Sequence, residues 1–329
     1  MRKKKEKLII KLSIICLLIL LIWQIKNSRK TNLEYDFAIS DTASITKIFL
    51  ADMQGNNITL DKKYNSWRVN NNYNVKNSSM KTILHTIKNI SVQRPIPESN
   101  YNQVIRNLAA NGVKIEIYIK NEKKPIKTYT IGNNTSDHAG TYMLLSGSKQ
   151  PYIMNIVGFN GVLGPRYGIQ GQRIDYTVWR DRSVFNLNAQ KIESLRMINI
   201  KGNDSSFTIK KLDEKFILLD FQNRVKSIKE EKLITYLNLF NNINCEAYRN
   251  DDARDKLTDE KKIFSLIIEH NNGIDSLDIY EIRSKGEPRQ ESEKYTAQRM
   301  YANNNSGDIM LIQNYVFNKL LININELIE

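Results

Sequence analysis

Two distant stretches of the chain share one order of apolar and polar side chains. Residues 58–69 read ITLDKKYNSWRV, and residues 207–218 read FTIKKLDEKFIL. In each stretch apolar residues largely alternate with polar ones on both sides of a polar turn, which is typical of two strands joined by a hairpin. The pattern therefore predicts a strand meander at both places.

These two stretches are 149 residues apart, and the same offset relates further segments of the chain. Residues 78–90 place apolar side chains on one helical face and have apolar counterparts within 233–239. The alternating residues Ile115, Ile117 and Ile119 have counterparts at Phe264, Leu266 and Ile268. These matches predict an α+β fold with two tandem copies of one unit, which is built from antiparallel strands and one or two packed helices.

The remaining elements and the domain limits follow from turn and helix signals. Ser78 or Ser79 is expected to cap the first helix, and Gly112 is expected to stop a second helix that begins at 98. Further strands are expected over residues 113–120, 126–131, 141–146 and 151–157. The expected domains are a basic stub with one transmembrane segment, a first copy with its linker and a second copy, at residues 1–30, 31–188 and 189–329.

An apolar segment lies near the N-terminus. Residues 8–25 contain one charge, Lys11, and a helix of this length spans about 27 Å, enough for the hydrocarbon core of a bilayer. Five Lys or Arg residues precede the segment and three follow it by residue 30. This bias predicts a single-pass protein of the cell inner membrane, with its N-terminus in the cytoplasm and residues 30–329 extracytoplasmic or periplasmic.

Three other interpretations of this segment are less favoured. A cleaved signal peptide would place small residues after the apolar run, which instead ends Ile-Trp-Gln-Ile-Lys at residues 22–26. A lipoprotein signal would place a small residue before its cysteine, whereas Cys16 follows two isoleucines in the middle of the segment. A buried core helix does not fit the basic flank. We therefore expect an uncleaved signal anchor.

The charge balance bears on possible partners. The chain of 329 residues has a net charge of +14, and residues 1–30 alone hold nine basic residues and one acidic residue. The other 299 residues hold 40 basic and 34 acidic residues. A nucleic-acid-binding domain usually concentrates basic residues on its folded part. We therefore expect the membrane, and no nucleic acid, to be a partner.

Few residues are available for metal or redox chemistry. The chain has two cysteines, Cys16 and Cys245, and three histidines. Two cysteines cannot form a disulfide framework or a cysteine zinc site. The acidic residues from 251 to 259 lie among lysines and arginines without the spacing of an EF-hand loop, so a solvated helix face is the preferred interpretation. No metal, cofactor or catalytic residue is assigned.

Two segments are candidate contact sites. Five glycines between residues 158 and 171 surround Arg166 and Tyr167 but lack the motif of a P-loop, so this loop is either a structural connection or a contact loop. Trp179 and Arg180 belong to the sequence WRDR, which either forms a partner hot spot or closes the first copy. A structural connection is the preferred interpretation of the glycine loop, and closure of the first copy is the preferred interpretation of the WRDR segment. The run Ser-Asp-His at 136–138 is interpreted as a polar hairpin loop, because consecutive residues cannot align as a catalytic triad.

Several short motifs resemble those of a bacterial family, the domain of unknown function numbered 4340. They are DTASITKI at 41–48, ITL at 58–60, WRVN at 67–70, YML at 142–144, PYI at 151–153 and WRDR at 179–182. The resemblance covers residues 37–190 well and the second half weakly. It implies a membrane-anchored envelope protein without an established activity, often associated with gliding-type or ABC-type transport components. It supplies no catalytic residue.

Two classes of function remain open. The preferred one is a non-catalytic binding or scaffold component of an envelope or transporter-associated assembly, with a protein partner and no cofactor. Its candidate contact residues are Arg166, Tyr167, Trp179 and Arg180. The alternative is an envelope hydrolase that acts on glycans, which would need a pair of carboxylates in a cleft. The spacing of the acidic residues does not indicate such a pair.

Overall fold

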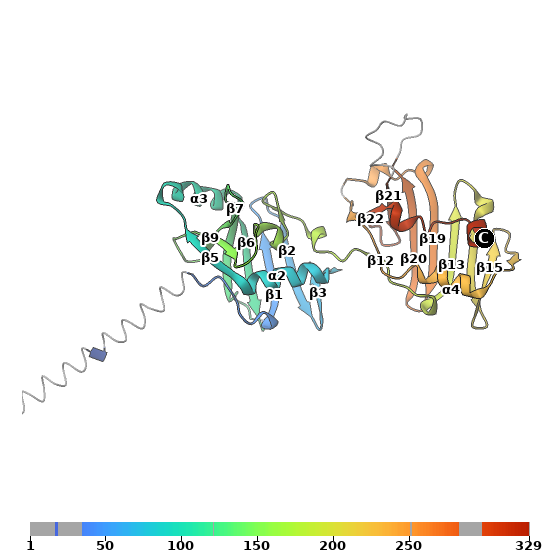
Figure 1. Ribbon diagram of the computed structural model, residues 1–329, viewed down its shortest axis with the longest axis horizontal. Helices are drawn as coiled ribbons and strands as arrows, with labels where there is room; N and C mark the ends of the chain where they lie inside the picture. Colours follow the sequence, from blue (N-terminus) through green and yellow to red (C-terminus); the bar gives the residue numbers. More distant parts are fainter. Residues whose placement is uncertain (1–16, 19–34, 121, 251, 283–297, 329) are drawn as a thin grey trace, which may run out of the picture. The chain divides into compact units, whose positions relative to one another are not determined.

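The computed structural model describes residues 17–18, 35–120, 122–250, 252–282 and 298–328 (Figure 1). The chain divides into two compact units between Asp181 and Arg182. Of the apolar segment 8–25, only Leu17 and Leu18 are described. Among all described residues, no helix has both the length and the apolar character needed to cross a membrane. Apart from these two residues, the expected anchor lies outside the described part of the chain.

The first unit is built on a nine-stranded antiparallel sheet. Its neighbour order is β4-β3-β2-β1-β6-β7-β8-β9-β5. In β1, Ile48 lies opposite Leu60 on one side and Ile117 on the other, and all three side chains are buried. The strands are β1 (Ile45–Ala51), β2 (Asn57–Lys63), β3 (Ser66–Val69), β4 (Tyr73–Asn74), β5 (Ile90–Pro95), β6 (Val113–Ile119), β7 (Lys127–Asn134), β8 (Thr141–Leu145) and β9 (Tyr152–Ile156).

Two helices cover opposite faces of this sheet. The helix α2 (Asn77–Asn89) contributes Met80, Ile83 and Ile87 to the main core, which also holds Met143 of β8. The helix α3 (Glu98–Asn111) lies beside β7 (Figure 1). It also packs on β8 and shares a smaller core with Tyr142 and Leu144 of that strand. Because successive strand residues point to opposite faces, α2 and α3 lie on different sides of β8.

The second unit has its own nine-stranded antiparallel sheet. Its order is β16-β15-β14-β13-β19-β20-β21-β22-β18, and β12 (Ser183–Phe185) pairs separately with β17 (Ile243–Asn244). The helix α4 (Glu230–Asn238) packs against β15, and two short helices, α6 (Asn314–Phe317) and α7 (Ile324–Ile328), follow the last strand. The strands are β13 (Ile192–Asn199), β14 (Phe207–Leu212), β15 (Lys215–Asp220), β16 (Val225–Lys226), β18 (Ala247–Tyr248), β19 (Lys262–His270), β20 (Gly273–Glu281), β21 (Arg299–Asn304) and β22 (Ile309–Gln313).

The two sheets have the same strand order when their strands are counted along the chain. In the first sheet Leu60 pairs with Val69, and in the second Ile209 pairs with Leu218, which are the counterparts that the sequence matches assign to them. The meander formed by β2 and β3 therefore has the same register as that formed by β14 and β15. The connection between β5 and β6 contains the long helix α3, whereas that between β18 and β19 contains two short 3-10 helices.

A single constant offset does not describe every strand. Ile48 faces both Leu60 and Ile117, whereas Leu195 faces both Ile209 and Ile268. By this register Ile268 corresponds to Ile117, whereas the sequence matches paired Ile268 with Ile119. The expected match of 115–119 to 264–268 is therefore out of register by one strand period, which is two residues. The apolar pattern alone cannot detect such a slip, because it leaves every side chain on the same face.

Most helix and strand limits expected for the first unit are confirmed. The helices expected over 78–90 and 98–110 are α2 and α3, and β6 to β9 lie where strands were expected. The expected cap is wrong: Lys76 occupies the N-cap position of α2, and no side chain there accepts a capping hydrogen bond. Ser78 and Ser79 instead lie inside the first helical turn.

Candidate functional site

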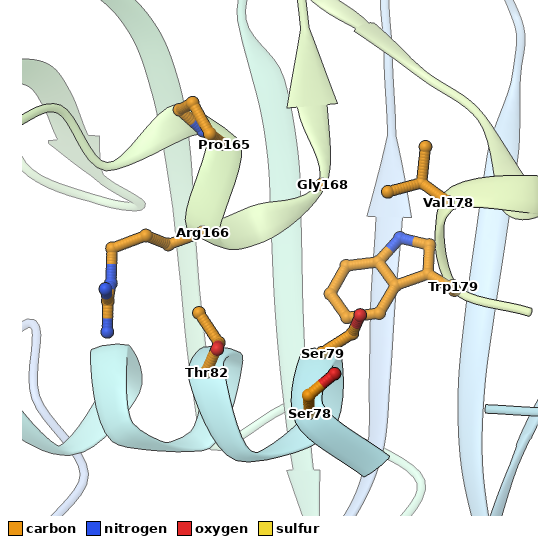
Figure 2. Close-up of a pocket in the computed structure, with 8 residues that line it drawn as sticks. All are labelled: Ser78, Ser79, Thr82, Pro165, Arg166, Gly168, Val178 and Trp179. Atoms are coloured by element: carbon orange, nitrogen blue, oxygen red, sulfur yellow. The ribbon is translucent and has the colours of Figure 1, made fainter. Parts of the chain in front are cut away.

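A pocket of about 190 Å³ lies in the first unit between the start of α2 and the chain that follows β9. Figure 2 shows hydroxyl side chains that project from α2 toward that chain, with Trp179 closing one end. The lining residues are Ser78, Ser79, Thr82, Pro165, Arg166, Gly168, Val178 and Trp179. Two of the four residues singled out from the sequence, Arg166 and Trp179, therefore belong to one pocket.

The start of α2 forms the floor of the pocket. The first N–H groups of a helix have no partner inside the helix, and they give this end a partial positive charge. The N–H of Lys76 donates to the carbonyl oxygen of Trp179 at 2.8 Å, which fixes the helix start against the far wall. Ser78, Ser79 and Thr82 follow within two turns and add three hydroxyl groups to the floor. The floor is therefore rich in hydrogen-bond donors.

Arg166 lies on the 3-10 helix η2 (Gly164–Tyr167), whose second residue is a proline. Its Nε donates to Thr86 Oγ1 at 2.8 Å, and its Nη2 lies 3.3 Å from His85 Nδ1. The guanidinium also lies 4.6 Å from the ring centroid of Phe159, a distance typical of a cation–π contact. These contacts hold the cation along one side of α2. It is the only ionisable residue among the eight described residues that line the pocket.

Trp179 closes the end of the pocket. It is 1% exposed, and its Nε1 finds no hydrogen-bond acceptor among the residues that the structure describes. Gly168, at the end of η2, adopts a left-handed φ of +69°, and a Cβ placed there would lie 2.7 Å from Trp179 Nε1. Glycine is therefore required at this position both by the backbone and by the packing of the indole.

Tyr167 points away from the pocket into the core. Its hydroxyl lies 2.8 Å from that of Tyr129, and both side chains are fully buried. Burial raises the pKa of both phenols well above the ordinary value, so both stay protonated. A protonated, buried pair cannot act as a base, and its geometry fits an anchor between the loop and β7.

Arg180 closes the edge of the first sheet. It is 4% exposed, and its Cζ lies 3.5 Å from the ring centroid of Tyr73, which itself stacks on Tyr176 at 5.9 Å. Its backbone forms an antiparallel bridge with Val75, and the N–H of Asp181 donates to the carbonyl of Asn74. The segment that contains Trp179 and Arg180 thus covers the edge strand β4, as expected for a closing segment.

The sequence did not single out the hydroxyl floor of the pocket. The sequence predicts a capping role for Ser78 or Ser79 and assigns no role to Thr82. A signal was present, because three hydroxyl residues within five positions occur at the start of an amphipathic helix. The sequence gives no reason to pair them with Arg166, which is distant along the chain. Only the folded loop brings them together.

The other candidate segments form turns. Residues 136–138 lie between β7 and β8, where Asp137 accepts hydrogen bonds from Thr135 Oγ1 and from the N–H of Ala139. The hydrogen bond from Thr135 lowers the pKa of Asp137. In the second unit, the acidic stretch contains two short 3-10 helices, and Arg249 pairs with Asp252 at 3.3 Å. No group of three metal-binding side chains occurs among the residues described.

The fold and pocket define a class: a protein of two mixed α+β units with antiparallel sheets and a small, donor-lined pocket in the first. The family model described as "Domain of unknown function (DUF4340)" matches residues 67–261. This match covers more than half of the chain, which therefore belongs to that family. The matched range starts later and extends further than the resemblance seen in the motifs, and it includes parts of both units. No curated protein and no solved structure matches the chain.

Proposed function

We propose that this chain is a single-pass, membrane-anchored extracytoplasmic protein that binds or scaffolds other envelope components without catalysing a reaction. The observation that carries the binding role is the pocket beside α2. Its lining combines three hydroxyl groups, Arg166 and a buried indole. The anchor and the orientation are supported by the apolar residues 8–25 and by the basic residues on their N-terminal side.

The lining of the pocket favours binding over hydrolysis of glycans. A glycosidase generally uses two carboxyl groups about 5–10 Å apart. The eight described lining residues contribute one ionisable side chain, the cation of Arg166. Tyr167, which is next to it in the sequence, is buried and protonated. The partner of this protein is expected to be a component of an envelope or transporter-associated assembly, as the family resemblance implies.

We also infer that the two units are copies of one ancestral unit. The identical strand order and the shared register of the two meanders support this inference. The helices support it as well: Ile83, Thr86 and Ile87 are buried in α2, and Leu233, Tyr236 and Leu237 are buried with the same spacing in α4. Leu233 therefore corresponds to Ile83, whereas the sequence matches paired it with the next residue, Leu84.

Filling the pocket tests the binding role. In the Thr82→Arg variant a long side chain enters the pocket from α2, while the Thr235→Arg variant makes the same change at an exposed position of α4. Full-length tagged chains are solubilised from membranes, and the partners that co-purify are quantified by mass spectrometry. We expect a stoichiometric partner to be retained by wild type and Thr235→Arg and to be lost from Thr82→Arg. An unchanged partner set in a folded Thr82→Arg variant would contradict a role for the pocket.

The topology is tested separately. A reporter that is active only outside the cytoplasm is fused after Glu329. We expect activity, because the basic flank precedes residue 8 and retains the N-terminus in the cytoplasm. Activity of a cytoplasmic reporter at the same position would contradict the proposed location.

A further inference from the structure

The solvent-facing side of α2 is basic. Lys81, His85 and Lys88 are exposed and fall within one face of the helix, since residues four and three positions apart are neighbours on a helix. Arg166 lies next to this face through its contact with His85. We call these four residues the α2 basic face. The opposite side of the helix, with Met80, Ile83 and Ile87, is buried in the core.

The α2 basic face is not neutralised by acidic neighbours. The helix itself contains no aspartate or glutamate. No ion pair joins Lys81, Lys88 or Arg166 to a carboxylate among the residues that the structure describes. The helix at the matching place in the second unit, α4, begins instead with Glu230 and Glu231.

The first unit as a whole also has a positive net charge. Residues 31–181 contain 18 lysines and arginines and 11 aspartates and glutamates. Residues 182–329 contain 22 basic and 23 acidic residues. The basic excess outside the N-terminal segment is therefore confined to the unit that follows this segment directly. A surface of this kind attracts anionic partners, and the attraction weakens with salt.

The length of the connecting chain limits what this surface can reach. Phe37, the first buried residue described in the first unit, is 12 positions after Ile25, the last residue of the apolar segment. An extended chain of this length spans at most about 40 Å. If the segment is anchored in a bilayer, Phe37, where the first unit begins, stays within this distance of the apolar segment. The second unit is tethered only through the first.

We propose that the α2 basic face docks on the anionic phospholipid headgroups of the membrane in which this chain is anchored. The inference rests on the proposed membrane anchor. Lysines near an anionic bilayer each strengthen association by about five-fold. Lys81 and Lys88 provide two such charges on one rigid helix. Docking would hold the first unit and its pocket at the membrane surface and leave the second unit, which has almost no net charge, in solution.

Hydrogen exchange of the full-length chain in nanodiscs tests this proposal. Nanodiscs of phosphatidylcholine are compared with nanodiscs that contain about 30% phosphatidylglycerol, a strongly anionic surface. We expect amides of residues 77–89 to exchange several-fold more slowly on the anionic nanodiscs. The protection should disappear at about 0.5 M salt, where the Debye length falls to a few ångströms.

Two double variants test whether the protection depends on the α2 basic face itself or only on the net charge of the chain. In Lys81→Gln/Lys88→Gln, the protection should be lost, because association weakens by about 25-fold when two lysines are neutralised. The matched control is Lys210→Gln/Lys215→Gln, which removes two exposed lysines from the second unit and should keep full protection. Equal exchange in the two lipids, with the wild-type chain inserted, would overturn the docking proposal.

Failure of the anchor gives a different result. A chain that alkaline carbonate releases from the nanodiscs is not inserted, and this outcome contradicts the proposed anchor. Soluble polyphosphate is the second probe. If polyphosphate protects residues 77–89 on phosphatidylcholine nanodiscs, and phosphatidylglycerol does not, the face binds an anionic polymer and the lipid proposal is wrong.

Discussion

At the scale of single residues, Asp220 shows how a turn in the second unit is held. Its carboxylate accepts hydrogen bonds from the N–H groups of Gln222 and Arg224 and from Arg224 Nε, and Lys226 Nζ lies at 3.2 Å. Burial opposes ionisation of this carboxyl, but these hydrogen bonds outweigh it and lower the pKa of Asp220 to about 2. The ionised form is thus the one that the fold prefers.

This preference predicts a pH dependence of stability. In the unfolded chain Asp220 titrates near its ordinary pKa of 3.8, so its contribution is complete above that pH and is lost as the pH falls toward 2. We expect the difference in unfolding free energy between wild type and Asp220→Asn to shrink over this interval. Urea unfolding at a series of pH values measures it. A difference that stays constant down to pH 2 would contradict the assignment.

Gly168 and Gly171 form a matched pair for a second prediction. Both have a positive φ, +69° and +54°, but a Cβ at Gly168 would overlap the indole of Trp179, whereas a Cβ at Gly171 would meet nothing within 4 Å. We expect Gly168→Ala to cost about 1–3 kcal/mol more stability than Gly171→Ala, since overpacking adds to the backbone strain. Chemical denaturation of the two variants gives the comparison. Equal costs would show that Trp179 has room to move.

At the scale of elements, periodicity predicted the strands and helices of the first unit well. Alternation is set by burial, and the apolar faces of α2 and β6 are buried as expected. Register was harder to predict because it depends on hydrogen bonds between distant strands, and a slip of one strand period leaves the pattern unchanged. Trp67 and Phe216 do occupy matching strand positions, opposite Lys62 and Lys211. Both are half-buried and pack against the core of their own unit.

The pocket was less predictable than the elements. Glycines around Arg166 and alternating charges beside Trp179 mark these residues in the sequence, but their contact with α2 depends on how the loop after β9 folds. The sequence also favours closure of the first copy as the role of the segment that contains Arg180. Sequence alone gives no measure of which polar groups remain unpaired once a loop is packed, and the Nε1 of Trp179 is such a group among the described residues.

Matched substitutions in the two main helices test the equivalence of the units. Ile83 in α2 and Leu233 in α4 are fully buried and hold matching places by the burial pattern. We expect Ile83→Ala and Leu233→Ala each to cost about 2–5 kcal/mol. Hydrogen exchange should show that each substitution raises exchange mainly within its own unit. A large effect of either one on both units would contradict two separate cores.

At the scale of the whole molecule, the family match includes the junction between the units, since it extends from β3 of the first into the segment before β19 of the second. The match therefore includes parts of both units. The basic charge is distributed unequally between them, so the unit next to the proposed anchor differs in electrostatics from the unit beyond it.

The proposed anchor gives a prediction about the mature chain. The apolar run is not followed by the small residues that signal peptidase requires, so residues 1–30 should be retained. Intact mass and N-terminal peptides of the protein purified from membranes measure this directly. An N-terminus between residues 24 and 34 would identify the segment as a removable signal.

The burial of Trp179 has a spectroscopic consequence. The three tryptophans of the chain are Trp23, Trp67 and Trp179, and all precede Arg182, so the second unit contains none. When the first unit unfolds, the indole of Trp179 passes from an apolar wall into water, and its emission shifts to longer wavelength. In a Trp23→Phe background, tryptophan emission therefore reports on the first unit alone, while circular dichroism reports on both. Comparing the two signals separates the unfolding of the two units without cutting the chain.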